Sequence, residues 1–214
     1  MSRENILEEI LNRKAVAVLR VKEENKLQKV IEAVYEGGIS VAEITMTVPN
    51  AIQLIEKMSE KLDKSIIIGV GSVLDTKTAE DAIKAGAKYV VSPVFKEDII
   101  KTAHKFNIPA MPGCFTPTEI LKAFESGADI VKVFPADVVG MGFFKAILAP
   151  MPHLRLMPTG GVTLTNAGDW IKAGACAVGI GSALLDKKAI QENDYFKLTE
   201  NAKIIMDSIA KADI

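Results

Sequence analysis

The stretch AFESGADIVKVFP, Ala123–Pro135, decides the fold, because it joins a helix-like segment through Gly-Ala to a short β-branched run. The same plan recurs in AIKAGAKYVVSP at Ala82–Pro93 and in WIKAGACAVGIGS at Trp170–Ser182. A looser copy is AVYEGGISVAEIT at Ala33–Thr45. One supersecondary unit that repeats along a chain indicates an architecture built from that unit.

Each copy has a glycine where its helix should end, at Gly37, Gly86, Gly127 and Gly174. Glycine adopts the left-handed conformation that closes a helix without a steric penalty. The apolar run that follows is continuous rather than alternating, which is typical of a parallel strand buried on both faces. The repeat therefore predicts a helix, a tight turn and a buried parallel strand.

Eight such apolar runs occur along the chain. They are Ala15–Arg20, Val41–Thr47, Ser65–Ser72, Tyr89–Pro93, Pro109–Gly113, Asp129–Pro135, Arg155–Gly161 and Ala177–Ser182. Helical patterns between and around them include Glu4–Asn12, Lys26–Glu36, Ala51–Lys61, Thr76–Ala85, Lys96–Phe106, Thr118–Glu125, Thr165–Ala173 and Asp194–Ala210. Eight strands alternating with helices predict an α/β fold, a (β/α)₈ TIM barrel with a short N-terminal helix that covers its bottom.

A doubly wound open sheet is the competing α/β layout. It usually shows a glycine-rich fingerprint after its first strand, whereas here the first strand continues into Leu19–Lys22 without a glycine. A length of 214 residues suits one domain, and no linker or low-complexity segment divides the chain. We therefore expect a single barrel domain over residues 1–214.

The composition excludes several classes of protein. With 49% apolar and 25% charged residues, the chain is neither disordered nor collagen-like. Its 26 basic and 27 acidic residues predict no nucleic-acid partner. The charged N-terminus is not a signal peptide, and no apolar stretch is long enough to span a membrane. We expect a cytoplasmic protein without a membrane partner.

Two charged residues lie inside runs that should be buried. Lys132 stands in IVKVFP, and burial without a partner favours the neutral amine that a Schiff-base nucleophile needs. Glu43 stands in VAEITMT, where a period of two places it on one side with Thr45 and Thr47. A lysine that reaches solvent and a structural ion pair are equally compatible with these residues.

Glycines gather at the ends of three predicted strands. Pro158–Val162 reads PTGGV after the seventh strand, and Gly179–Leu184 reads GIGSAL after the eighth. TIM barrels frequently bind phosphate with these two loops, where glycine N–H groups and the hydroxyls of Thr159 and Ser182 can donate hydrogen bonds. Gly69–Ser72 leaves room at the barrel mouth. Glycines also simply end strands, so a structural role stays open for each loop.

The sequence predicts no metal and no cofactor. His104 falls in a predicted outer helix and His153 in a loop, and neither has a second ligand at metal-binding spacing. Cys114 and Cys176 form neither a zinc motif nor a disulfide framework.

Together these motifs resemble the 2-keto-3-deoxy-6-phosphogluconate (KDPG) and 4-hydroxy-2-oxoglutarate (KHG) aldolase family. The matching pieces occur in family order over nearly the whole chain: AVLR (Ala17–Arg20), EGG and AEITMT (within Glu36–Thr47), GVGSVL (Gly69–Leu74), VSP (Val91–Pro93), MPGCFTPTE (Met111–Glu119), KVFPA (Lys132–Ala136), PTGGV (Pro158–Val162) and GIGSAL (Gly179–Leu184). KVFPA and PTGGV are the most specific pair.

The resemblance implies a class I aldolase, a homotrimeric barrel that forms a Schiff base and uses no metal. The family's Schiff-base lysine matches Lys132, and its acid–base glutamate matches Glu43. Its substrate-binding positions match Arg20, Thr47, Ser72, Pro93, Phe134 and Thr159. Its phosphate-binding positions match Gly160, Gly161, Gly181 and Ser182. The implied partner is a small 2-keto acid sugar phosphate.

Thr47 departs from the family pattern. Many members carry arginine there, in a motif E-x-T-x-R that is thought to hold the substrate carboxylate. A hydroxyl donates one neutral hydrogen bond where a guanidinium donates two charge-assisted ones. Arg20 could compensate for this loss.

The expected reaction is reversible cleavage of KDPG to pyruvate and D-glyceraldehyde 3-phosphate, with cleavage of KHG to pyruvate and glyoxylate as a second activity. Within the family, 2-keto-3-deoxy-6-phosphogalactonate is an alternative substrate. A sugar-phosphate epimerase or isomerase and a catalytically silent phosphosugar-binding barrel are the alternatives from other classes.

Overall fold

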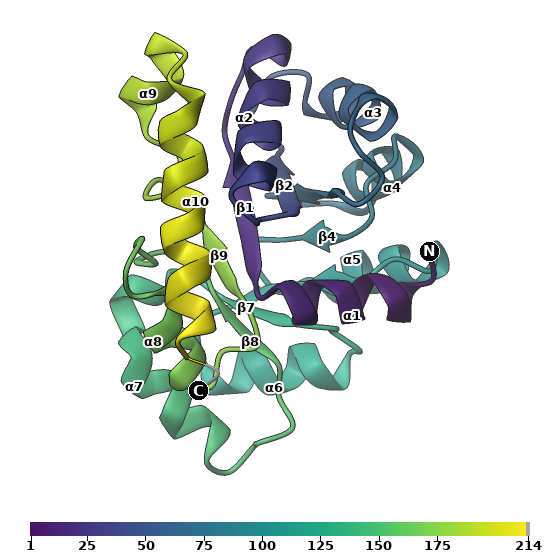
Figure 1. Ribbon diagram of the computed structural model, residues 1–214. Coiled ribbons are helices and arrows are strands. Elements are labelled where there is room, and N and C mark those ends of the chain that lie inside the picture. Colours follow the sequence, from purple (N-terminus) through teal and green to yellow (C-terminus); the bar gives the residue numbers. More distant parts are fainter. Residues whose placement is uncertain (213–214) are drawn as a thin grey trace.

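Parallel strands form the centre of the computed structural model, which describes residues 1–212 (Figure 1). Six of them form one sheet in the order β5-β4-β3-β2-β1-β9. Their bounds are β1 Ala15–Leu19, β2 Val41–Thr45, β3 Ile67–Gly71, β4 Val90–Val91, β5 Ala110–Met111 and β9 Val178–Ile180. The other three, β6 Gly113–Cys114, β7 Val131–Val133 and β8 Leu156–Pro158, form a sheet in the order β6-β7-β8. The expected α/β class with parallel strands in sequential order is confirmed.

The two sheets approach each other at two places. Only Pro112 separates β5 from β6 along the chain. Between β8 and β9, an isolated parallel bridge pairs Thr159 with Gly179, and the backbone N–H of Cys176 donates to the carbonyl oxygen of Leu156 at 2.9 Å. The edges of the two sheets therefore lie next to each other at both places.

The predicted strand Pro109–Gly113 is two strands in the structure. Proline has no N–H to donate to a ladder, and Pro112 stands where β5 ends and β6 begins. Its carbonyl oxygen still accepts a hydrogen bond of 3.0 Å from the backbone N–H of Lys132. The chain therefore pairs with the larger sheet before Pro112 and with the smaller sheet after it.

Helices cover the outside of the strands (Figure 1). They are α1 Arg3–Arg13, α2 Glu24–Glu36, α3 Ala51–Lys61, α4 Thr76–Lys84, α5 Glu97–Lys105, α6 Pro117–Glu125, α7 Ala136–Leu148, α8 Ala167–Lys172, α9 Lys187–Glu192 and α10 Tyr195–Ala210. The N-terminal helix α1 is held by Arg3, whose Nε donates to Oδ1 of buried Asp129 at 2.8 Å. The long helix α10 packs against α2 and α8, which closes the layer of helices.

Helix α7 has no counterpart among the predicted helical patterns. Its sequence, ADVVGMGFFKAIL, is apolar on nearly all sides and therefore lacks the one-sided period of an amphipathic helix. Gly140, with φ 70° and ψ 176°, interrupts it in the middle.

The glycine turns follow the prediction in three of the four copies. The three tighter copies have positive φ values of 111°, 93° and 102° at Gly86, Gly127 and Gly174. In the looser copy the prediction for Gly37 is wrong, because its φ is −79° and Gly38 takes the positive φ of 100°. Gly37 serves another purpose: a Cβ there would collide with the Cβ of Ala202 on α10.

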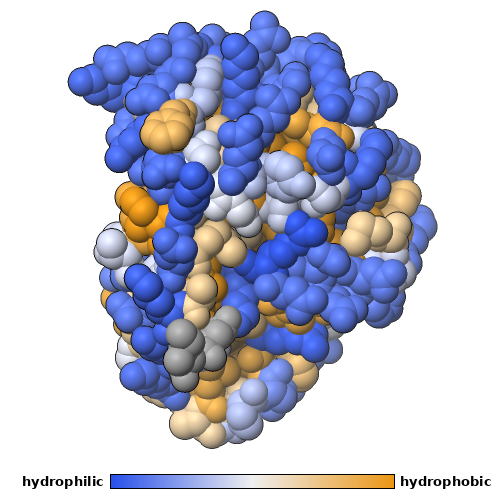
Figure 2. All heavy atoms as spheres, in the orientation of Figure 1, coloured by the Kyte–Doolittle hydropathy of each residue, from blue (hydrophilic) through white to orange (hydrophobic). Residues whose placement is uncertain are grey.

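In the orientation of Figure 1 the surface is mostly hydrophilic, with separate apolar patches (Figure 2). None of the helices within residues 1–212 combines the length and the apolar character needed to cross a membrane.

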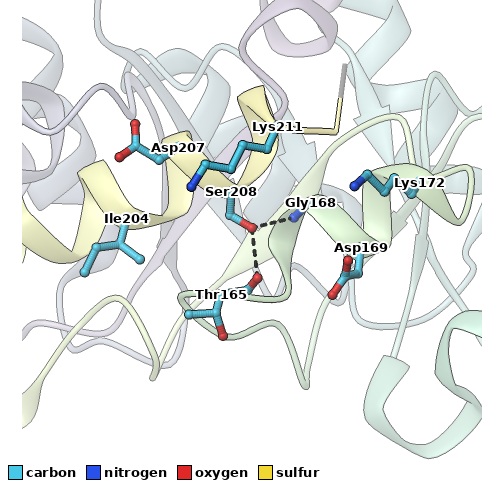
Figure 3. Close-up of a pocket in the computed structure, with 8 residues that line it drawn as sticks. All are labelled: Thr165, Gly168, Asp169, Lys172, Ile204, Asp207, Ser208 and Lys211. Atoms are coloured by element: carbon cyan, nitrogen blue, oxygen red, sulfur yellow. Dashed lines mark hydrogen bonds between the residues drawn. The ribbon is translucent and has the colours of Figure 1, made fainter. Parts of the chain in front are cut away.

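An open cavity of about 440 Å³ lies between α8 and α10. Its lining side chains include Asp169, Lys172 and Lys211 (Figure 3). Ser208 Oγ accepts a hydrogen bond from Gly168 N at 3.0 Å and donates one to the carbonyl oxygen of Thr165 at 2.9 Å. These bonds fasten α10 to α8, so the cavity belongs to helix packing rather than to the strand ends.

Candidate active site

Two charged side chains face the interior of the strands. Register pairs Glu43 of β2 with Gly69 of β3, and Lys132 of β7 with Gly113 of β6. Paired residues in parallel strands direct their side chains to the same face. Glu43 is 1% exposed and Lys132 is 5% exposed, so neither reaches out to bulk solvent.

Lys132 forms no ion pair with any residue in the part of the chain that the structure describes. Its Nζ lies 5.3 Å from the centre of the Phe134 ring. A buried ammonium without a carboxylate is costly, and an aromatic face offsets only part of that penalty. A lysine amine at such a place is a candidate nucleophile for a carbonyl group.

Glu43 is a buried carboxyl group whose two oxygens are sealed from solvent. Neither oxygen has a hydrogen-bond partner among the described residues. The carboxyl group lies over Gly71, where a Cβ would collide with it. Buried polar groups are nearly always hydrogen-bonded, and the exceptions include catalytic groups. Glu43 can therefore exchange protons with a molecule bound in the same interior.

Phe134 lies beside Lys132, and Pro93 lies beside the strand partner of Lys132. A Cβ at Gly113, the strand partner of Lys132, would collide with the carbonyl oxygen of Pro93. Phe134 follows two residues after Lys132 and turns its ring toward the amine. The Phe134–Pro135 peptide bond is cis. The structure thus brings Phe134 to the lysine and the backbone of Pro93 to the neighbouring strand residue, Gly113.

Thr159, Gly160 and Gly161 continue the chain beyond β8. Thr159 is buried, and its Oγ1 has no hydrogen-bond partner within residues 1–212. Gly160 and Gly161 have φ values of 97° and 72°, a region that side chains rarely adopt, so glycine is required at both. Gly161 also packs closely on Asp137, at the start of α7. This loop exposes backbone groups that a side chain would cover.

Arg20, Gly181 and Ser182 line one cavity of about 100 Å³ together with Lys187. The pairing of β1 with β9 brings them together, because Arg20 follows β1 and the glycine loop follows β9. Four apolar side chains complete the lining, and the two basic side chains and the hydroxyl are the groups in it that suit an anion. Gly181 itself is not required by space, since a Cβ there would be 3.7 Å from its nearest neighbour.

Thr47 and Ser72 lie just beyond the ends of β2 and β3. Thr47 Oγ1 is 2.7 Å from Thr45 Oγ1, which also lies 3.3 Å from the carbonyl oxygen of Leu19. Thr45 donates its one proton to Leu19, so Thr47 is the donor to Thr45 and gives up that bond when it donates to a ligand. Ser72 has a φ of 60°, which is uncommon for a residue with a side chain.

Tyr89 is a residue of this interior that the sequence patterns placed only at the start of a strand. It is fully buried, and its hydroxyl has no partner among the described residues. Burial first, and the Glu43 carboxylate second, raise the pKa of Tyr89 well above its usual value. The signal in the sequence was a tyrosine within a continuous apolar run. This signal is weak, because a phenylalanine in the core would fit the same hydrophobic pattern.

The comparisons with known proteins identify the family of this chain. A family model described as KDPG and KHG aldolase matches residues 6–201. The chain belongs to the KDPG and KHG aldolase family. It is thus an aldolase, a carbon–carbon lyase.

This aldolase is similar to two curated relatives and to one solved structure. The 2-dehydro-3-deoxy-phosphogluconate aldolase of Pseudomonas aeruginosa is 30% identical over 91% of this chain and 88% of that protein. A probable 2-dehydro-3-deoxy-6-phosphogalactonate aldolase of Rhizobium meliloti is 34% identical over 81% of this chain and 82% of that protein. The KDPG aldolase from Legionella pneumophila, with pyruvate captured as a covalent carbinolamine, is 27% identical with a TM-score of 0.86, covering 93% of this chain and 97% of that one.

Among the side chains of residues 1–212, no group of three or more His, Cys, Asp or Glu could hold a metal ion.

Proposed function

We propose that this aldolase cleaves KDPG reversibly to pyruvate and D-glyceraldehyde 3-phosphate through a Schiff base on Lys132. The observation that carries the proposal is a lysine in the middle of β7 that is 5% exposed and makes no ion pair with the described residues. Structural lysines are seldom buried without a partner. Membership of the KDPG and KHG aldolase family supports the assignment.

The reaction begins when the neutral Nζ of Lys132 attacks the C2 carbonyl of the substrate and forms a carbinolamine. Glu43 supplies a proton to the departing hydroxyl group, water leaves, and an iminium remains. Glu43 then takes the proton of the C4 hydroxyl, the C3–C4 bond breaks, and its electron pair moves into the iminium. Protonation of the resulting enamine at C3 and hydrolysis release pyruvate and restore Lys132. A positioned acid–base group of this kind typically contributes about 10²–10⁴-fold.

The strands of this proposal close into a (β/α)₈ barrel in which β5 and β6 count as one strand. The Thr159–Gly179 bridge supports closure between β8 and β9. Closure beside β7 is supported by two hydrogen bonds of 3.0 Å, from Asp129 N to Ala110 O and from Lys132 N to Pro112 O. In a closed barrel the interior faces of β2 and β7 point into one cavity, which is where Glu43 and Lys132 need to meet.

The phosphate of the substrate binds, in this proposal, to Gly160, Gly161, Gly181 and Ser182. The positive φ values of Gly160 and Gly161 and the cavity that joins Ser182 to Arg20 support this placement. Arg20 adds a charge-assisted hydrogen bond to the phosphate rather than to the carboxylate.

The other end of the substrate lies, in this proposal, among the remaining predicted residues. Thr47 and Ser72 donate to its carboxylate, Thr159 donates to a hydroxyl, and Pro93 and Phe134 enclose its pyruvate portion. The position of Phe134 over the Lys132 amine and the orphaned Thr159 hydroxyl support these roles.

A second candidate substrate is 2-keto-3-deoxy-6-phosphogalactonate, the epimer of KDPG. The 34% identity to a probable phosphogalactonate aldolase favours keeping it. KHG, which has no phosphate, is the third substrate to compare. The values of kcat/KM for the three rank them directly.

The proposal is tested with pyruvate and borohydride. Reduction should trap a covalent adduct that peptide mapping assigns to Lys132, and Lys132→Arg should give none. Active wild-type enzyme without a label on Lys132 would refute the assignment. A sugar-phosphate epimerase would give no reducible adduct, and a silent binding barrel would gain thermal stability with ligand without releasing pyruvate.

Three further expectations accompany this function. One domain spans residues 1–214, of which 213–214 lie outside the described residues. A homotrimer follows from the family resemblance, and sedimentation would measure it. The cytoplasmic location stays a prediction.

A further inference from the structure

We propose that Tyr89 is a positioning residue of this aldolase, whose hydroxyl holds the carboxyl group of Glu43 during proton transfer. Because Tyr89 acts here through Glu43, the proposal rests on the proposed function. It rests on the Tyr89 hydroxyl and the two Glu43 carboxyl oxygens, which are buried without a hydrogen-bond partner among the described residues. The strand register places the two residues in one row.

Tyr89 reaches toward Glu43 across a glycine. Register pairs Glu43 with Gly69, and Val70 with Val90, so that Gly69 stands between Glu43 and Tyr89 in one row. Neighbouring strands are roughly 4.8 Å apart, which places the Cα atoms of Glu43 and Tyr89 about 10 Å apart. A Cβ at Gly69 would collide with Cζ of Tyr89, the carbon that bears the hydroxyl. The phenol end of Tyr89 therefore lies beside the stem of Glu43.

The orphaned atoms on the two residues are complementary. The Tyr89 hydroxyl and both Glu43 carboxyl oxygens are sealed from solvent, and none has a partner in the described part of the chain. A phenol has one proton to donate, and an ionised carboxyl group can only accept. Phenylalanine would fill the same space without burying an unpaired hydroxyl, which is unfavourable. A hydroxyl at this place therefore indicates a role in bonding.

The two glycines on β3 make room for the two side chains: the Glu43 carboxyl group fills the space over Gly71, and the Tyr89 ring fills the space over Gly69. The carboxyl group thereby lies toward the end of the strand where the predicted substrate residues gather. Gly69 and Gly71 are roughly 6.6 Å apart along β3, so a modest turn of the Glu43 side chain brings one carboxyl oxygen within reach of the Tyr89 hydroxyl. Tyr89 thus holds one oxygen of the Glu43 carboxyl group while the other oxygen is directed toward the substrate, which positions Glu43 for proton transfer.

Electrostatics keep the Tyr89 hydroxyl a donor. Burial and the Glu43 carboxylate both raise the pKa of Tyr89, so the phenol retains its proton over the working pH range. The other buried charged side chain on the strands that the structure describes is Lys132 on β7, whereas Arg20, just beyond β1, is exposed. The interior residues of β3, Gly69 and Gly71, contribute none.

The experiment compares wild type, Tyr89→Phe, Glu43→Gln and the double variant, with Tyr195→Phe as a control. Tyr195 lies on α10, and its hydroxyl donates only to Asn193 among the described residues. We expect Tyr89→Phe to lower kcat for KDPG cleavage about tenfold, to shift the acidic limb of the kcat profile to higher pH and to leave KM within about twofold. A tenfold change corresponds to about 1.4 kcal/mol.

Two half-reactions separate positioning from binding. Tyr89→Phe should slow deuterium exchange into the methyl group of pyruvate about tenfold, while borohydride trapping on Lys132 continues. In the Glu43→Gln background the same substitution should change nothing further. Tyr195→Phe should match the wild type throughout.

Unchanged kcat and pH profile in Tyr89→Phe would overturn the proposal, and so would a full tenfold loss in the Glu43→Gln background. If the wild type releases no pyruvate from any of the three substrates, the proposed function fails. The contact between Tyr89 and Glu43 is then tested by proton NMR alone. A slowly exchanging, low-field hydroxyl proton that Tyr89→Phe removes and Glu43→Gln shifts would support the contact. Its absence from wild type would overturn it.

Discussion

Substitution of Gly71 by alanine offers a direct test of the Glu43 geometry. A Cβ at this position would lie inside contact distance of Oε1, Cδ and Cγ of Glu43. These atoms form the far end of a flexible side chain, so Glu43 can turn away and the backbone of β3 can stay in place. The φ of Gly71 is not in the left-handed region, and alanine adopts it without backbone strain. The structure therefore predicts a change in activity that exceeds the change in stability.

The magnitude follows from the role of Glu43. A general acid–base group contributes about 10²–10⁴-fold, so a displaced Glu43 should lower kcat by at least about 100-fold, or about 2.7 kcal/mol. Overpacking in a core costs about 1–3 kcal/mol, and the mobile carboxyl group should keep Gly71→Ala near the lower figure. Gly113→Ala is the matched control, because its Cβ would collide with the backbone of Pro93, which cannot turn away. It should lose more stability than Gly71→Ala.

The assay is pyruvate release coupled to lactate dehydrogenase, with urea unfolding for stability and borohydride trapping for Lys132. Gly71→Ala should still be trapped, because its lysine is unaffected. Adding Glu43→Gln to Gly71→Ala should lower kcat little further. Wild-type kcat in a folded Gly71→Ala variant would refute the assigned position of Glu43.

Three further outcomes follow from the structure. Arg20→Ala should raise KM for KDPG about 10- to 100-fold, since hydrogen bonds to charged groups contribute about 1.5–3 kcal/mol, and it should leave KM for KHG nearly unchanged; equal effects on both substrates would contradict its place beside the phosphate. The N–H groups of Phe115 and then Thr116 lower the pKa of Glu119, so its stabilising effect is present above the ordinary pKa of glutamate and is lost as pH falls through the lowered one. Glu119→Gln should therefore reduce the urea midpoint more at pH 7 than at pH 3, and an equal reduction would contradict the linkage. Burial raises the pKa of the Cys114 thiol to about 12, so iodoacetamide at pH 8 should leave it unlabelled in the folded protein and label it in urea, as mass spectrometry can measure; rapid labelling of the folded protein would count against its burial.

The elements were predictable because their signals are local. Helix, glycine and β-branched run follow one another within a dozen residues, and the turns at Gly86, Gly127 and Gly174 have the expected conformation. Helix α7 was not predicted, because apolar residues on all sides give no period. The strand at Pro109–Gly113 was placed but its break was not, since the effect of Pro112 depends on which neighbouring strand pairs with each half.

The candidate site was predictable where a residue contradicts its surroundings. Lys132 and Glu43 are charges inside apolar runs, and such residues stand out without a structure. Tyr89 did not stand out, because its hydroxyl gains meaning only when Gly69 leaves space above a neighbouring strand. Nor did the local sequence indicate that Arg20 shares a cavity with Ser182.

By itself, the sequence determined the order of helices and strands, the turns that join most of them and the position of each charge along its strand. These features depend on neighbours within one or two turns of chain. Only the tertiary structure decided which side chains meet. The register of β2, β3 and β4 sets Glu43 near Tyr89, and the pairing of β1 with β9 sets Arg20 beside Ser182. Register arises from packing across the whole interior, because a strand shifted by one residue would turn its side chains to the opposite face.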